Sequence, residues 1–117
     1  MTINNKNKII EYFESGIKKK ELIGVENEKF LFFKDIGKRA DYLIVQKLLE
    51  AFSKEYDWKK INENSNLIGL KLDGKSISLE PGNQLELAGD KLNNIHEVCS
   101  ESYNFQDQLT KICNKLN

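Results

Sequence analysis

The fold is decided by residues 67–89, which read LIGLKLDGKSISLEPGNQLELAG. Within this stretch Asp73-Gly74 is a strong signal for a tight hairpin turn, and the runs on either side of it are rich in strand-forming apolar residues. Pro81-Gly82 bends the chain a second time, and a third short strand is expected over residues 84–87. The stretch therefore predicts three antiparallel strands joined by two turns.

The rest of the chain adds helices and further strands around this meander. Apolar spacing predicts a short helix over residues 5–17, an amphipathic helix over 39–55, and one long helix or two shorter ones from Leu92 onward. Aromatic and β-branched residues predict strands over 22–33 and 58–61. This order of elements is typical of the α+β class, with an antiparallel sheet and flanking helices.

The composition excludes several functional classes. Eighteen basic residues balance 18 acidic ones, and a zero net charge argues against binding to nucleic acid or to an anionic membrane. No apolar run approaches the ~20 residues of a membrane span. The first residues lack the apolar segment of a secretory signal, and two cysteines form no disulfide framework. We therefore expect a cytoplasmic protein, whose 117 residues form one domain or part of one.

Two glutamates precede the first aromatic run. Glu26 and Glu28 are two residues apart in Gly24-Val-Glu-Asn-Glu-Lys-Phe30, so in a strand both side chains point to one face. Like charges on one face repel each other unless a cation lies between them, and Mg²⁺ prefers oxygen ligands of this kind. The alternative is a solvated strand edge, since acidic residues are mostly exposed.

A second pair of glutamates flanks the bend at Pro81-Gly82. Glu80, Gln84 and Glu86 share one face if the bend preserves the alternation of side chains. The alternative is the polar face of a half-exposed sheet. Two acid pairs on strands of one sheet would form a carboxylate-lined metal site of the kind that serves phosphoryl transfer.

Several other residues are expected to be structural. Trp58 and the run Phe30–Phe33 are predicted in the core, and Cys99 and Cys113 are predicted as small buried residues on a helical stripe. His96 is interpreted as an ordinary surface histidine of the long helix.

The motifs occur in an order that resembles a known family. These are the stretches Glu11-Tyr-Phe-Glu-Ser-Gly16, Gly24–Phe30, Tyr56-Asp-Trp58, Ile68-Gly-Leu-Lys71, Ser76–Gly89 and Ile95-His-Glu-Val-Cys99. Over about residues 8–113 the chain is similar to the N-terminal portion of the plant-type glutamate–cysteine ligases (γ-glutamylcysteine synthetases), and Ser76–Gly89 is the most specific part. The chain is thus interpreted as a single partial domain, residues 1–117, of a glutamine-synthetase-like catalytic fold.

The resemblance implies a reaction and a set of site residues. The family phosphorylates the γ-carboxylate of L-glutamate with ATP, and the amine of L-cysteine then attacks to give γ-glutamylcysteine, the first step towards glutathione. Its G-x-E-x-E-K-F and S-L-E-P-G-x-Q-x-E-L motifs match Glu26, Glu28, Glu80 and Glu86 as Mg²⁺ ligands. Gln84 and Arg39 are implied as residues that contact the nucleotide or substrate, and no catalytic residue is assigned.

The sequence also departs from the family. Val25 and Asn27 stand where Thr and His are common, and Asn83 replaces a frequent Gly. The family's enzymes are several times longer, and one arginine, Arg39, does not supply several bidentate anion clamps.

Three interpretations of this partial match stay open. The chain is the N-terminal part of a ligase, an inactive truncated remnant, or a non-catalytic module that pairs with a separate C-terminal part. An isolated sheet of this kind is expected to leave apolar residues uncovered, with Phe30, Phe32, Leu70 and Leu72 as candidates, and so to favour self-association.

Overall fold

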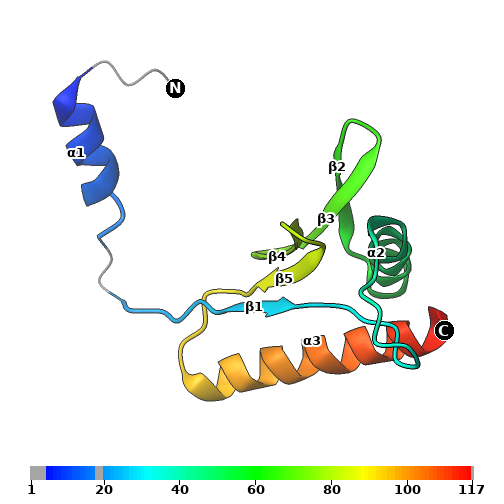
Figure 1. Ribbon diagram of the computed structural model, residues 1–117. Coiled ribbons are helices and arrows are strands. Elements are labelled where there is room, and N and C mark those ends of the chain that lie inside the picture. The colour runs from blue at the N-terminus through cyan, green and yellow to red at the C-terminus, as the bar shows by residue number, and fades with distance from the viewer. Residues whose placement is uncertain (1–4, 18–19, 117) are drawn as a thin grey trace.

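The computed structural model describes residues 5–17 and 20–116 of the chain. In sequence order its elements are α1 (Lys6–Glu14), β1 (Glu26–Lys29), α2 (Tyr42–Tyr56), β2 (Lys59–Glu63), β3 (Asn66–Leu72), β4 (Lys75–Glu80), β5 (Gln84–Ala88) and α3 (Ile95–Leu116). The strands form one sheet in the order β1-β5-β4-β3-β2, and every neighbouring pair is antiparallel (Figure 1). The predicted α+β class with an antiparallel sheet and flanking helices is confirmed.

The two predicted turns of the meander are present. Leu72 pairs with Lys75 around Asp73-Gly74, and Asp73 takes a left-handed φ of 51°. In the second turn Gly82 and Asn83 have φ angles of 77° and 60°. Glycine and asparagine adopt this conformation with the least strain, so the sequence of the turn suits its backbone.

One face of the sheet packs on helices α2 and α3. Ile77, Leu85 and Leu87 alternate along β4 and β5 and are nearly fully buried on this face. On β3 Leu67 and Leu70 are both buried although they are three residues apart, because the register of β3 against β2 shifts between them. The remaining side chains of this core cluster come from the helices and their flanks: Ala40, Val45, Leu48, Leu49, Phe52, Trp58, Phe105, Leu109 and Ile112.

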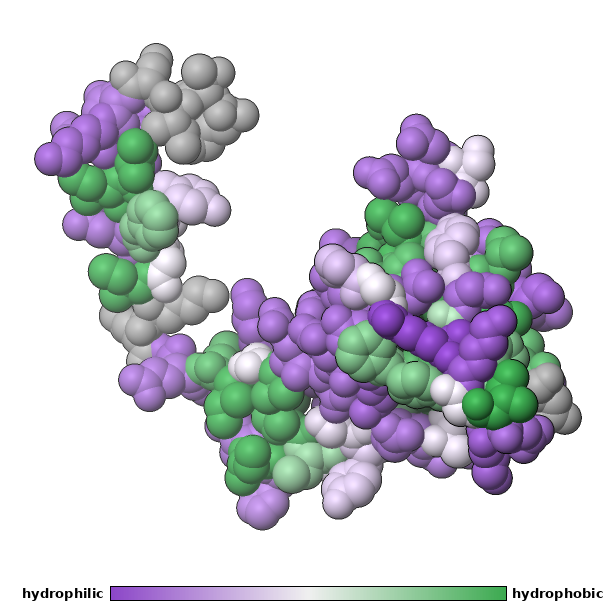
Figure 2. Space-filling model, viewed as in Figure 1, coloured by the Kyte–Doolittle hydropathy of each residue, from purple (hydrophilic) through white to green (hydrophobic). Residues whose placement is uncertain are grey.

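Helix α1 stands apart from this core (Figures 1 and 2). None of its residues is buried, and Phe13 is 73% exposed. The radius of gyration of 17.4 Å exceeds the ~13 Å of a compact chain of this length, because the N-terminal arm extends outward. The space-filling view shows apolar side chains on the near face of this helix (Figure 2).

Several predicted boundaries and burials are wrong. The strand expected over 22–33 is regular only at Glu26–Lys29, because the chain then turns back at residues 33–37 and forms an isolated bridge between Phe32 and Arg39. Phe30 and Phe32 are about half exposed, which contradicts their prediction in the core and confirms their prediction as uncovered apolar residues, whereas Leu70, expected on an uncovered face, is fully buried.

The start of the C-terminal helix also differs from the prediction. Helix α3 begins at Ile95 because Leu92 is drawn into a bridge with Ile23, and Asn94 caps the helix by accepting a hydrogen bond from the Glu97 backbone N–H at 3.0 Å. From there α3 continues as one unbroken helix.

The predictions for Trp58 and His96 are confirmed, because Trp58 is buried and His96 is exposed. Cys99 and Cys113 are exposed instead of buried. Both cysteines lie beside the buried stripe of α3 and not within it, because that stripe is formed by Val98, Phe105, Leu109 and Ile112.

Candidate functional site

Strand pairing brings the predicted glutamates onto the sheet face that the helices leave open. Glu28 on β1 pairs directly with Glu86 on β5, and Glu86 pairs on its other side with Ser78 of β4. Glu26 and Glu80 have the same side-chain parity on their strands, so the four carboxylates share this face. We call Glu26, Glu28, Glu80 and Glu86 the acidic face.

Glu86 is the centre of the acidic face. Partial burial raises the pKa of its carboxyl above the ordinary value of 4.5, and the negative charges of Glu26, Glu80 and Glu28 raise it further. A hydrogen bond to Glu28 acts in the same direction. All three carboxylates are therefore near enough to Glu86 for their repulsion to be felt.

The surroundings of the acidic face leave it accessible. Glu26 and Glu28 are exposed, and Glu80 and Glu86 are half-buried. Gln84 pairs with Glu80 across the β4–β5 turn and adds an amide oxygen to the same face. Beside Glu26 lies a small hollow of about 300 Å³ that is bounded by Gly24, Val25, Ala88 and Gly89.

The donor chemistry of the acidic face suits a hard cation, although no metal cage is ready-made. Carboxylate and amide oxygens are the ligands that Mg²⁺ and Ca²⁺ accept. Burial is the main cause of the raised pKa of Glu86, and the neighbouring negative charges that add to it are ones that a cation would relieve. Within residues 5–17 and 20–116, no three His, Cys, Asp or Glu side chains are arranged to close on one ion. Cation binding would therefore require these glutamates to change rotamer.

Arg39 lies at the turn end of the same face. Its guanidinium carbon is 4.5 Å from the centre of the Phe30 ring, and Phe30 follows Glu28 with the same parity on the chain. The guanidinium also packs against Gly82 in the turn between Glu80 and Gln84. The sequence singled out Arg39 as the lone arginine and, through the family resemblance, as a residue that contacts the nucleotide or substrate. Its contacts with Phe30 and Gly82 depend on register and turn geometry, which no local motif signals.

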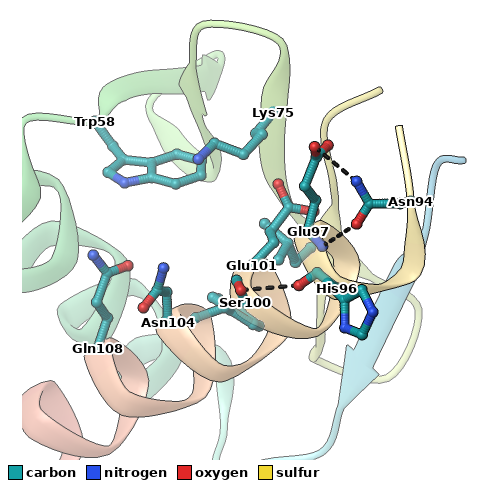
Figure 3. A pocket seen from close by; sticks show the side chains of 11 residues that line it. Trp58, Lys75, Asn94, His96, Glu97, Ser100, Glu101, Asn104 and Gln108 are labelled. Carbon is teal, nitrogen blue, oxygen red and sulfur yellow. Dashed lines mark hydrogen bonds between the residues drawn. The ribbon is translucent and has the colours of Figure 1, made fainter. Parts of the chain in front are cut away.

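A second, wider hollow is on the opposite, helix-covered face of the sheet. It measures about 730 Å³ and opens between Trp58 and the N-terminal half of α3 (Figure 3). Its charged groups are already engaged: Lys75 lies over the Trp58 ring, and Glu97 accepts hydrogen bonds from Asn93 and Asn94. Glu101 accepts a hydrogen bond from the Asp90 backbone N–H at 3.1 Å.

These interactions engage the charged side chains Lys75, Glu97 and Glu101 of the hollow. The acidic face and Arg39 lie on the other side, and they remain the better candidate site because they bring four carboxylates and an arginine without a carboxylate partner among the described residues to one accessible face.

Comparison with known proteins supports the resemblance. No protein-family model matches the chain. Glutamate–cysteine ligase A of Oryza sativa subsp. japonica is 43% identical over 98 residues, which cover 82% of this chain and 20% of that protein. The enzymes of Nicotiana tabacum and Arabidopsis thaliana are 37% and 36% identical over 113 and 110 residues, or 22% and 21% of their lengths.

This chain is homologous to a portion of the plant glutamate–cysteine ligases. It spans about a fifth of the length of the curated relatives that it matches, which agrees with the predicted N-terminal portion of such an enzyme.

One prediction about this ligase homologue is wrong. The relatives are all named chloroplastic enzymes, which contradicts the expected cytoplasmic location. The error has a physical reason, because a reduced pair of cysteines and the lack of a secretory signal do not separate one reducing compartment from another. The described helices include none that is long and apolar enough to span a bilayer.

Proposed function

We propose that this chain supplies the N-terminal part of the catalytic sheet of a glutamate–cysteine ligase, as one partial domain. The observation that carries the proposal is the acidic face, in which strand register places Glu86 beside Glu26, Glu28 and Glu80. These four residues are also the ones that match the acidic motifs of the family. Homology at up to 43% identity supports the same assignment.

In the proposed reaction ATP transfers its γ-phosphoryl group to the γ-carboxylate of L-glutamate. The amine of L-cysteine then forms the amide bond and expels phosphate, so that the products are γ-glutamylcysteine, ADP and phosphate. Bound Mg²⁺ would neutralise phosphate oxygens during this transfer. In the protein, Glu26, Glu28, Glu80 and Glu86 would hold the ion.

Gln84 and Arg39 would contact the nucleotide or substrate from the turn end of the acidic face. Gln84 can donate or accept through its amide, and it lies on the same strand as Glu86. Arg39 offers a planar guanidinium that suits phosphate and carboxylate oxygens. Both residues therefore position anionic groups next to the proposed cation site.

The proposed active enzyme needs residues beyond this chain. Its single arginine leaves the usual anion clamps of phosphoryl transfer incomplete. We propose that a C-terminal portion, joined or separate, supplies them and covers the exposed apolar residues. The substrates of the complete enzyme would be L-glutamate, L-cysteine and ATP.

A chimeric enzyme tests the proposed function. The matched segment of the Nicotiana tabacum ligase is replaced by this chain, and cysteine-dependent ADP release and γ-glutamylcysteine formation are measured. We expect activity that falls by at least about a hundredfold in Glu86→Gln, the scale on which electrostatic groups act in catalysis. Glu50→Gln, which changes an exposed glutamate on α2, is the matched control.

Activity is compared only between chimeric proteins that are folded. A folded chimera without activity, or one in which Glu86→Gln and Glu50→Gln behave alike, contradicts the proposal and favours a remnant without catalytic role.

A further inference from the structure

The backbone returns Arg39 to the end of strand β1. The Ala40 N–H donates to the Leu31 carbonyl and the Phe33 N–H donates to the Lys38 carbonyl, both at 2.8 Å. These bonds close a hairpin-like loop in which Phe32 and Arg39 are bridged. The position of Arg39 is therefore set by main-chain pairing, which holds it more firmly than a free surface loop would.

Two side contacts orient the guanidinium of Arg39. Its central carbon stacks 4.5 Å from the centre of the Phe30 ring. On another side, Nη2 lies so close to Gly82 that a Cβ at that position would overlap it. The Asn83 side-chain amide donates to the Ala40 carbonyl at 3.5 Å and joins the same turn to the Arg39 loop.

The charge of Arg39 has no carboxylate partner among residues 5–17 and 20–116. The ion pairs found there are Lys111–Asp107 and Lys115–Glu55, both on the helices. Four glutamates lie on the neighbouring face, yet none of them forms an ion pair with the guanidinium, which stacks on Phe30 instead. Its N–H donors consequently remain available to an anion at the turn end of the acidic face.

We infer that Arg39, held by Phe30 and Gly82, forms an oxyanion subsite at the turn end of the acidic face. The subsite takes a phosphate or carboxylate oxygen pair, which the planar guanidinium binds through two parallel hydrogen bonds. Phe30 and Gly82 are positioning residues, because they fix the guanidinium without offering it a hydrogen-bond acceptor side chain. The inference rests on the proposed function for the kind of anion that binds, and on the geometry around Arg39 for the position of the subsite.

The lone arginine makes a direct test possible. The ¹⁵N-labelled 117-residue chain has a single arginine Nε–H signal, and this signal is followed by NMR in titrations with tripolyphosphate and, separately, with L-glutamate. Each titration is run with and without Mg²⁺. We expect a saturable shift of the Arg39 signal, and the arm that produces it identifies a phosphate or a carboxylate as the bound group.

Two variants test the positioning residues against matched controls. Phe30→Leu removes the stack and should weaken binding by roughly two- to fivefold, the usual strength of an exposed cation–π contact. Gly82→Ala should weaken it at least as much, because the added Cβ displaces Nη2. Gly37→Ala places the same strain on a left-handed glycine with open space around it, and Phe13→Leu changes an exposed ring on α1.

An Arg39 signal that stays in place in every titration of the folded chain overturns the inference. Equal affinities in Gly82→Ala and Gly37→Ala overturn the positioning role. A shift with tripolyphosphate that is unaffected by Mg²⁺ keeps the oxyanion subsite and contradicts the cation site of the proposed function, so the two failures are distinguishable.

Discussion

Glu28 of β1 lies directly opposite Glu86 of β5, and this cross-strand pair of like charges is the central feature of the acidic face. Directly opposite like charges destabilise a sheet, and here two further glutamates add to the repulsion. A protein that needed only a stable solvent face would gain nothing from this arrangement. If a cation binds there, as proposed, these carboxylates serve as its ligands.

The first prediction concerns the pH dependence of stability. Glu86 holds its proton more tightly in the folded chain than in the unfolded chain because its pKa is raised. Well below the ordinary value of 4.5 the carboxyl is protonated in the folded and the unfolded chain, so it does not change the stability of the fold. As the pH rises from there through the raised pKa, the stability of the fold decreases. Glu86→Gln should therefore raise the melting temperature at neutral pH and have little effect in acid. Equal shifts at both pH values would contradict this.

The second prediction concerns magnesium. If Mg²⁺ binds the acidic face of the isolated chain, a concentration ten times the dissociation constant stabilises the fold by about 1.4 kcal/mol. That corresponds to several degrees in the thermal midpoint. The shift should be lost in Glu28→Gln and kept in Glu50→Gln. The absence of any shift in the unmodified chain would mean that the acidic face alone does not hold the ion.

The third prediction concerns the activity of the 117-residue chain by itself. We expect no γ-glutamylcysteine synthesis, because phosphoryl transfer depends on positioning and electrostatics that a partial site does not complete. The measurement is cysteine-dependent ADP release together with product detection. Synthesis by the purified chain that disappears in Glu26→Ala would show the expectation to be wrong.

The fourth prediction concerns self-association. Phe13 and Ile17 in the N-terminal arm and Phe32 beyond β1 are exposed apolar residues, with exposed fractions of 73%, 80% and 59%. Large exposed apolar side chains favour association, so light scattering should give a mass above that of the monomer as concentration rises. Phe13→Ser should reduce the association. A monodisperse monomer with a cooperative melt at high concentration would argue against it.

The fifth prediction concerns the start of α3. Asn94 and Glu97 exchange hydrogen bonds at the first turn. The pKa of Glu97 is lowered chiefly by hydrogen bonds that its carboxylate accepts from the Asn93 backbone and side chain, and less by the bond from the Asn94 side chain. Asn94→Ala should cost about 1 kcal/mol of stability, whereas Asn104→Ala in the middle of the helix should cost less. Because the pKa of Glu97 is lowered, its contribution exists above the ordinary value of 4.5 and decreases in acid. Chemical denaturation at two pH values measures both effects.

The sequence by itself determined the local elements and the identity of the acids. Asp73-Gly74 and Pro81-Gly82 enforce tight turns through backbone preferences that need no distant partner. The meander, and the shared face of Glu80, Gln84 and Glu86, could therefore be predicted from the sequence. The amphipathic pattern of α2 was equally local. The family motifs predicted Glu26 and Glu28 as Mg²⁺ ligands, and this prediction needs no information on strand register.

The tertiary structure decided the contacts between segments that are distant in the sequence. Three features depend on β1 joining the edge of the sheet. They are the pairing of Glu28 with Glu86, the position of Arg39 between Phe30 and Gly82, and the shortening of the strand around β1. Register is set by the summed burial and hydrogen bonding of whole strands. Local preference contains no information about that sum, so the sequence named the charged residues and only the fold placed them together.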